Sequence, residues 1–144
     1  SYCNKLKFVQ TAREEREVDK MVERMNVKLS TPAQPIGSLS GGNQQKAILG
    51  KWLLTKPNVL ILDEPTRGID VGAKYEIYSL IAKLAAEGMA VILISSELPE
   101  IMGMADRVIT FCEGRITAEF TSNEIEQERI VNAAFGFQNA EELS

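Results

Sequence analysis

Residues 59–66, Val-Leu-Ile-Leu-Asp-Glu-Pro-Thr, decide the fold class that the sequence predicts. The four apolar residues show no alternation, which is typical of a strand buried on both faces of a parallel sheet. Asp63 and Glu64 follow directly, at the end of the strand where open α/β sheets bind their ligands. One carboxylate can hold Mg²⁺ while the other orients or deprotonates a water. Taken alone, such a pair is more often a turn or a helix cap.

Helices and a second strand are expected on both sides of this strand. Periodic apolar residues predict helices over 11–26, from Ser40 to before Pro57, and over 72–87. An apolar run at 90–94 predicts another buried strand, so the order from Val59 is strand, helix, strand, which indicates an α/β fold. The expected inward-facing residues of the second and third helices are Ile48, Leu49, Trp52, Leu53, Ile77, Leu80, Ile81 and Leu84.

The C-terminal third is predicted to hold shorter elements. A helix is expected over 98–104, because Pro99 suits a first helical turn. Residues 107–111 and 116–120 are expected to form a hairpin, and 124–134 a final helix before a frayed tail.

Composition limits the possible functions. The 144 residues, 44% hydrophobic and 25% charged, suit one domain with a core. A net charge of −4 provides no basic surface for a nucleic-acid backbone. Cys3 and Cys112 lack metal-site spacing and there is no histidine, so zinc, disulfide and histidine chemistry are poorly supported. Catalysis would have to rest on carboxylates or a metal.

A glycine-rich stretch, GSLSGGNQQK at 37–46, precedes the first strand. It nearly fits the phosphate-loop template, with Gly37 and Gly42 correctly spaced, but Asn and Gln stand where Lys and Ser/Thr belong. Ser40 offers a hydroxyl, two glycines let backbone N–H groups approach oxygen closely, and a helix N-terminus favours an anion. The alternative is a glycine turn that only opens a helix.

These motifs together resemble the ATP-binding-cassette (ABC) ATPases. LSGGNQQ at 39–45 is similar to the signature motif, LILDEPT at 60–66 to the Walker B strand, and GID at 68–70 to the D-loop. The wider runs over 39–54, 62–78 and 93–109 resemble the second cassette of the double-cassette ATPases of bacterial monosaccharide importers, most closely those for galactose and methylgalactoside. The resemblance implies ATP and Mg²⁺ as cofactors.

The resemblance also implies a role for each matching residue. Asp63 would assist Mg²⁺, Glu64 would orient water, and Asp70 would couple the two cassettes. Ser96 stands where active cassettes usually place a histidine near the terminal phosphate, so the chain's own site is expected to be impaired. The residues expected to contact ATP held by the opposite cassette are Ser40, Gly41, Gly42 and Gln44.

The implied fold is a partial P-loop NTPase domain, a mostly parallel sheet flanked by helices and lacking the Walker A half. Residues 1–38 would be helical subdomain and linker, 39–120 the ATPase core, and 121–144 a C-terminal helix and tail. The sequence begins too late to hold a Walker A loop, so we interpret it as a fragment that does not turn over ATP alone. The missing strand would leave a gap in the sheet, closed by rearrangement, by another copy or by N-terminal residues.

Implied partners are a second cassette, transmembrane permease subunits and, indirectly, a periplasmic sugar-binding protein, with no nucleic acid. The expected location is cytoplasmic, peripheral on the inner face of the membrane. One alternative is a non-catalytic dimerisation or interaction module, favoured by Ser96 and the missing Walker A loop. A DNA-repair ATPase is the other, but it calls for coiled coils and a basic groove. The sequence does not fix the sugar.

Overall fold

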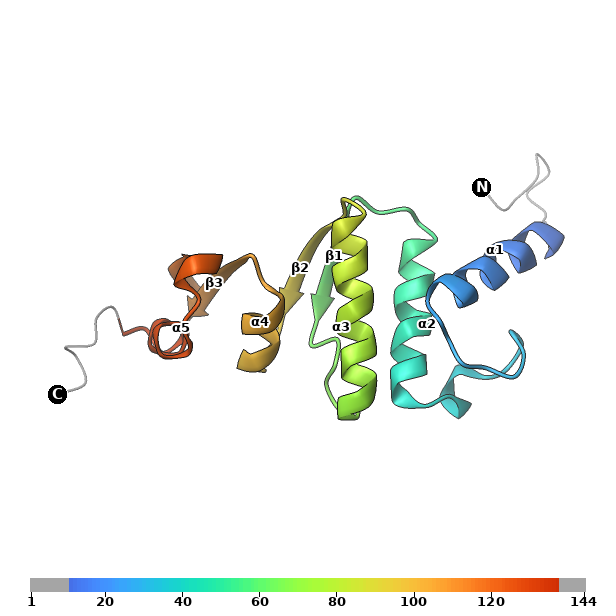
Figure 1. Cartoon of the computed structure of the whole chain (residues 1–144), viewed down its shortest axis with the longest axis horizontal. Coiled ribbons are helices and arrows are strands. Elements are labelled where there is room, and N and C mark those ends of the chain that lie inside the picture. The colour runs from blue at the N-terminus through green and yellow to red at the C-terminus, as the bar shows by residue number, and fades with distance from the viewer. Residues whose placement is uncertain (1–10, 138–144) are drawn as a thin grey trace. The chain divides into compact units, whose positions relative to one another are not determined.

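We describe a computed structural model over residues 11–137 (Figure 1). The chain divides after Ile92 into two compact units, and each is described by itself. The predictions for Cys3 and for the tail after residue 137 lie outside the described residues. The elements in chain order are α1 (Thr11–Arg24), η1 (Ile36–Ser38), α2 (Gly41–Leu53), β1 (Val59–Asp63), α3 (Val71–Ala86), β2 (Ala90–Ile94), α4 (Leu98–Met104), β3 (Arg107–Cys112), β4 (Arg115–Thr121), η2 (Ser122–Glu124) and α5 (Gln127–Ala134).

Three helices build most of the first unit. Helices α2 and α3 lie side by side, and the end of α1 crosses α2 (Figure 1). The crossing is close at Gly50, where a Cβ atom would lie 3.0 Å from Met21 Cγ and 3.2 Å from Met25 Cγ. Gly88, with φ of 94°, ends α3 as expected. The predicted helices of this unit are therefore confirmed, with small shifts of their ends.

The core of the first unit uses only one side of α2. Leu49 and Leu53 are buried as expected. The same expectation was wrong for Ile48 and Trp52, whose side chains are 41% and 56% exposed. Each lies one residue, and so about 100° of helical rotation, away from its buried neighbour Leu49 or Leu53, and therefore on a more exposed side of α2. The other buried apolar residues of β1 and α3 are Leu60, Leu62, Ile77, Ile81 and Leu84.

Strands β1 and β2 form a two-stranded parallel sheet. Both predicted strands exist, but the expectation that they are buried on both faces is wrong. In β1, burial alternates: Leu60 and Leu62 are buried, whereas Val59 and Ile61 are 51% and 64% exposed. In β2, Ile92 is half exposed. The strands alternate because their apolar residues meet a covering layer on one face only within the described part of the chain.

The second unit is built on a hairpin. Strands β3 and β4 are antiparallel, with Val108 opposite Phe120. Glu113 and Gly114, with φ of 49° and 76°, form the connecting turn, as a two-residue hairpin loop requires. Helix α5 packs on the hairpin through Ile130. The predicted hairpin is thus confirmed, and the final helix begins at Gln127, after a 3₁₀ turn.

The described strands make two separate sheets, β1–β2 and β3–β4. Between residues 11 and 137 no rearranged strand joins them, and pairing with another copy or with residues 1–10 stays a prediction. The α/β class is confirmed. Within the described part, no helix combines the length and apolar character needed to span a membrane.

Candidate functional site

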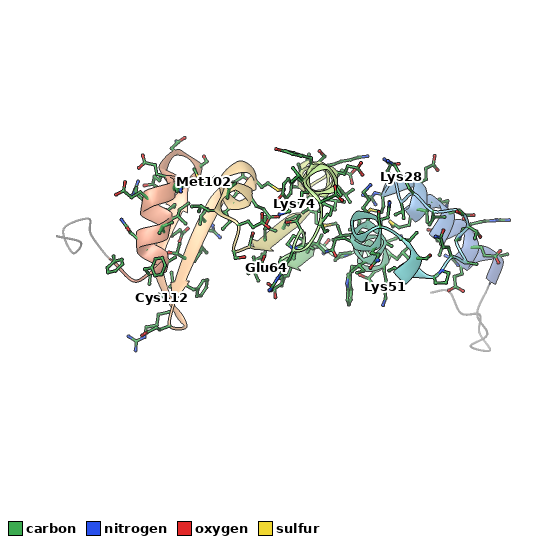
Figure 2. All side chains as sticks on the ribbon, turned by 90° about the horizontal axis from the view of Figure 1, so that it is seen from below. Lys28, Lys51, Glu64, Lys74, Met102 and Cys112 are labelled. Atoms are coloured by element: carbon green, nitrogen blue, oxygen red, sulfur yellow. The ribbon has the colours of Figure 1, made fainter. Side chains whose placement is uncertain are left out.

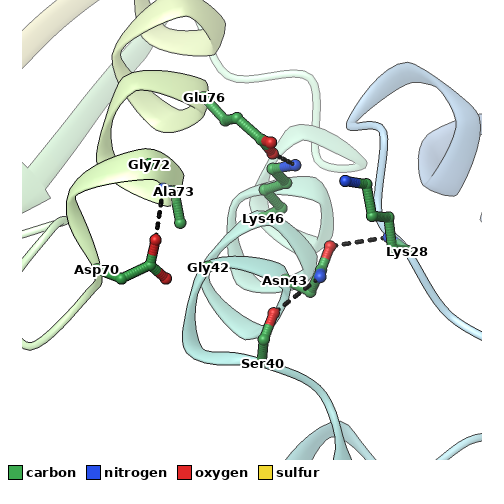
Figure 3. A pocket seen from close by; sticks show the side chains of 9 residues that line it. All are labelled: Lys28, Ser40, Gly42, Asn43, Lys46, Asp70, Gly72, Ala73 and Glu76. Carbon is green, nitrogen blue, oxygen red and sulfur yellow. Dashed lines mark hydrogen bonds and ion pairs between the residues drawn. The ribbon is translucent and has the colours of Figure 1, made fainter.

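A shallow pocket of about 340 Å³ opens where α2 and α3 begin (Figure 3). It brings together three residues singled out by the sequence: Ser40, Gly42 and Asp70. Two helix N-termini meet here, and each favours negative charge. The pocket is lined by Lys28, Ser40, Gly42, Asn43, Lys46, Asp70, Gly72, Ala73 and Glu76.

Ser40 is the N-cap residue of α2, yet its side chain makes no capping hydrogen bond. Instead its Oγ accepts a hydrogen bond of 2.9 Å from the Asn43 side chain. Asn43 is held in turn, because its Oδ1 accepts from the backbone N–H of Lys28 at 2.8 Å (Figure 3). Asn43 therefore orients the hydroxyl of Ser40, and Asn43 is itself held by Lys28 in the loop that follows α1. From the sequence alone, Asn43 is only a mismatch to the phosphate-loop template.

The two glycines of the signature stretch have different surroundings. A Cβ atom on Gly41 would meet nothing within 4 Å, whereas one on Gly42 would lie 2.6 Å from Ala73 Cβ. Gly42 is thus required by the close approach of α2 to α3. A side chain on Gly41 would point into open space, where a ligand could come near the backbone.

The Gln44 side chain folds back on its own helix. Its amide donates to the carbonyl oxygen of Leu39 at 2.8 Å, and Gln44 does not line the pocket. The contact with nucleotide assigned to Gln44 by resemblance stays a prediction. Asn43, one residue earlier, occupies the pocket instead.

Asp70 is the N-cap residue of α3. Its Oδ1 accepts a 2.9 Å hydrogen bond from the backbone N–H of Ala73. This contact stabilises the start of α3 and turns the carboxylate to the pocket edge. Capping alone accounts for an aspartate here, so its role in coupling cassettes stays a prediction.

Lys46 and Glu76, which both line the pocket, form an ion pair (Figure 3). The Lys46 side chain is only 4% exposed, and its Nζ also donates to the Asn26 carbonyl oxygen at 3.1 Å. The hydrogen bond and charge of Lys46 hold the pKa of Glu76 below its usual value, and Lys28 lowers that pKa further. The sequence gives no sign of this pair, because its residues are thirty positions apart and meet only once α2 packs on α3.

Asp63 and Glu64 lie at the end of β1 and do not line the pocket. Glu64 has φ of 48°, a left-handed conformation that is uncommon outside glycine and turns the chain sharply (Figure 2). The buried side chains of Pro65 and Thr66 fix the following turn. Among residues 11–137 no group of three or more possible ligands could hold a metal alone. One or two carboxylates still fit Mg²⁺, since that ion keeps waters and phosphate oxygens as ligands.

Ser96 belongs to the second unit, in the loop between β2 and α4, and is exposed. The neighbouring Ser95 shapes this loop: its hydroxyl donates to the buried Glu100 and accepts from the backbone N–H of Glu97 at 3.0 Å. Ser96 is thereby set on the outside of the loop, and its catalytic role stays a prediction.

Comparisons with known proteins agree with the motifs. A family model described as ABC transporter matches residues 3–67. The xylose import ATP-binding protein XylG of Geobacillus kaustophilus is 53% identical over 132 residues, which cover 92% of this chain and 26% of that protein. The ribose import ATP-binding protein RbsA of the same organism is 52% identical over 129 residues, covering 90% and 26%. The expected likeness to galactose importers is not supported by these relatives.

The chain spans about a quarter of the length of the curated relatives it matches. Among solved structures, an ATP-binding cassette of an ABC transporter in its ADP conformation superposes with a TM-score of 0.72 at 25% identity, covering 84% of this chain and 49% of that one. A dimeric cassette bound to ADP and Pi has a TM-score of 0.69 at 19% identity, which shows the fold alone. The chain therefore belongs to the ABC transporter ATPases, and its homologues of high identity are ATP-binding proteins of sugar importers.

Proposed function

We propose that this chain supplies the signature face of the ATP-binding subunit of a sugar importer, and that this face closes on ATP held by an opposite cassette. The observation that carries the proposal is the pocket at the shared start of α2 and α3, with Ser40 exposed at its rim. The whole subunit would couple ATP binding and hydrolysis to monosaccharide uptake.

The local chemistry supports an anionic ligand at this face. Ser40 does not cap its own helix, so the first N–H groups of α2 receive no hydrogen bond from its side chain. Helix N-termini attract phosphate through such groups and through the helix dipole. Gly41 leaves the space above them open, and Asn43 holds the Ser40 hydroxyl. The signature residues would thus contact the terminal phosphate without a lysine of their own.

Asp63 and Glu64 are proposed to serve the chain's own nucleotide site. Asp63 would hold Mg²⁺ through its carboxylate, and the ion would neutralise charge on the phosphates. Glu64 would orient the attacking water from its position after β1. Ser96 can donate a hydrogen bond but never carries charge, so we expect this site to be weaker than one with a histidine.

The partners follow from the same proposal. A second cassette would bring the Walker A loop that faces Ser40, and permease subunits would receive the motion of the helical region around α1. A periplasmic binding protein would deliver the sugar, with this chain at the cytoplasmic face. The relatives named for xylose and ribose import make a pentose the proposed cargo.

A non-catalytic interaction module remains the second candidate, favoured by the exposed apolar residues Val59 and Ile61 on β1. Calorimetry of the chain with Mg-ATP tests separately whether the chain by itself hydrolyses ATP. We expect no measurable hydrolysis by the chain alone, because the contacts that cradle the inner phosphates come from a Walker A loop.

Removing the Ser40 hydroxyl tests the proposed function. In the assembled transporter, Ser40→Ala is expected to lower the rate of ATP hydrolysis about tenfold, because a hydrogen bond to a charged phosphate oxygen is lost. Ser79→Ala, at an exposed serine on α3, is the matched control and should leave the rate unchanged. Equal rates for the two variants would contradict the proposed function.

A further inference from the structure

We propose that Lys46 is a positioning residue: its buried ammonium group fixes the rotation of α2 against α3 and so holds Ser40 and Asp70 at one pocket. The proposal rests on the proposed function of the signature face, and adds a residue that never touches the nucleotide.

Three segments meet at the Lys46 side chain. Its Nζ is paired with the Glu76 carboxylate on α3 (Figure 3). The same Nζ donates a hydrogen bond to the Asn26 carbonyl oxygen at 3.1 Å. Asn26 follows α1 in a left-handed conformation, with φ of 49°, which asparagine tolerates better than most residues. A single ammonium group thereby connects the end of α1 with α2 and α3.

A charged residue is an unusual choice for this buried position. Burying an ammonium group carries a large desolvation cost, and its partners do little more than offset that cost. An apolar side chain of similar volume would give comparable or better stability. The pair adds a defined orientation of α2 against α3. An ion pair with a second hydrogen bond has one favourable geometry, whereas apolar contacts permit the helices to slide and rotate against each other.

The pair lies one helical turn from the closest contact between the two helices. Lys46 follows Gly42 by four residues and therefore lies on the same face of α2. Glu76 follows Ala73 by three residues on α3, and Gly42 packs directly on Ala73. Two contacts one turn apart fix both the spacing and the rotation of α2. The rotation decides where Ser40 points relative to Asp70.

The test is kinetic, in the assembled transporter that contains this chain. Lys46→Met keeps an unbranched side chain of nearly the same volume, one atom shorter, but removes its charge. We expect kcat for ATP hydrolysis to fall on the order of tenfold, because a misplaced phosphate contact slows closure and chemistry. The KM for ATP and the melting temperature should change little. Lys51→Met, at an exposed lysine of the same helix, is the control and should leave kcat unchanged.

Two further variants keep the proposal falsifiable. Lys46→Arg retains the charge and both acceptors, and is expected to recover most of the lost kcat. Glu76→Gln weakens the same contact from the half-exposed side, and is expected to lower kcat in the same direction. If Lys46→Met does not fold, Glu76→Gln decides, with a wild-type kcat overturning the proposal.

The remaining outcomes also separate this inference from the proposed function. A loss of kcat that accompanies an equal loss of thermal stability would show a merely structural role and overturn the inference. If Ser40→Ala slows hydrolysis and Lys46→Met does not, the inference fails and the proposed function stands. If neither variant slows hydrolysis, both fail.

Discussion

Replacing Gly42 with valine is expected to destabilise the fold by about 3 kcal/mol, the upper end of the cost of overpacking. A Cβ atom at this position would lie 2.6 Å from Ala73 Cβ, far inside van der Waals contact. The Ala73 methyl group is attached to the backbone of α3 and has no rotamer to change, so the helices must move apart. Urea denaturation of the purified protein, followed by helical circular dichroism, measures the change.

Gly41→Val is the matched control, because a side chain there meets nothing within 4 Å. Its cost should stay below about 1 kcal/mol, the range of helix propensities. Ala73→Gly removes the group that Gly42→Val strikes, and combining the two should recover part of the loss. Equal destabilisation by valine at both glycines, or no recovery in the double variant, would contradict the packing described for α2 and α3.

Truncating Leu49 to alanine is expected to destabilise the first unit by about 2–5 kcal/mol, because a buried leucine leaves a cavity as well as losing its transfer free energy. Leu49 is 1% exposed on the side of α2 that faces α1 and α3. Thermal or urea unfolding of the protein measures the effect.

Ile48→Ala is the control from the same turn of the helix. Ile48 is 41% exposed, so its truncation should cost less than about 1 kcal/mol. The two residues are both apolar and adjacent, and only the direction in which each points differs. Similar losses from both truncations would mean that Ile48 is buried as well as Leu49, as the sequence alone suggested.

Local patterns predicted the elements well and their burial less well. The helix of residues 41–53 and the hairpin closed at Glu113 and Gly114 depend on neighbouring residues, and both are present. Which face of an element is covered depends on segments distant in sequence. The run around Ile61 therefore indicated a strand correctly, but gave no sign that one face of it would be exposed.

The residues of the candidate site were likewise predicted only in part from the sequence. Resemblance to a motif located Ser40, Gly42 and Asp70, which the structure brings to one pocket. It did not locate Asn43 or Lys46, because their partners come from the loop after α1 and from α3. A polar residue three positions after an N-cap serine is a known signal for a contact at a helix start, and it could have indicated Asn43.

The mismatch to the phosphate-loop template acquires a physical explanation from these contacts. Where that template has a lysine, Asn43 orients a hydroxyl; the lysine of this stretch, Lys46, is buried against Glu76 rather than presented to a ligand. The signature stretch is thus arranged to offer a hydroxyl and backbone N–H groups at its surface. Its positive side chain is used for internal positioning.

Burial of Ser40 on nucleotide binding is the most direct test of the central claim, that the start of α2 closes on ATP. A cysteine replaces Ser40 in an assembled transporter without other cysteines, and the rate of its labelling by a maleimide is measured with and without ATP and vanadate. Lys51→Cys, exposed further along α2, is the control. We predict that nucleotide slows labelling at position 40 roughly tenfold or more, because a buried thiol is shielded from reagents, and leaves position 51 unchanged. Equal labelling of position 40 in both conditions would contradict the account.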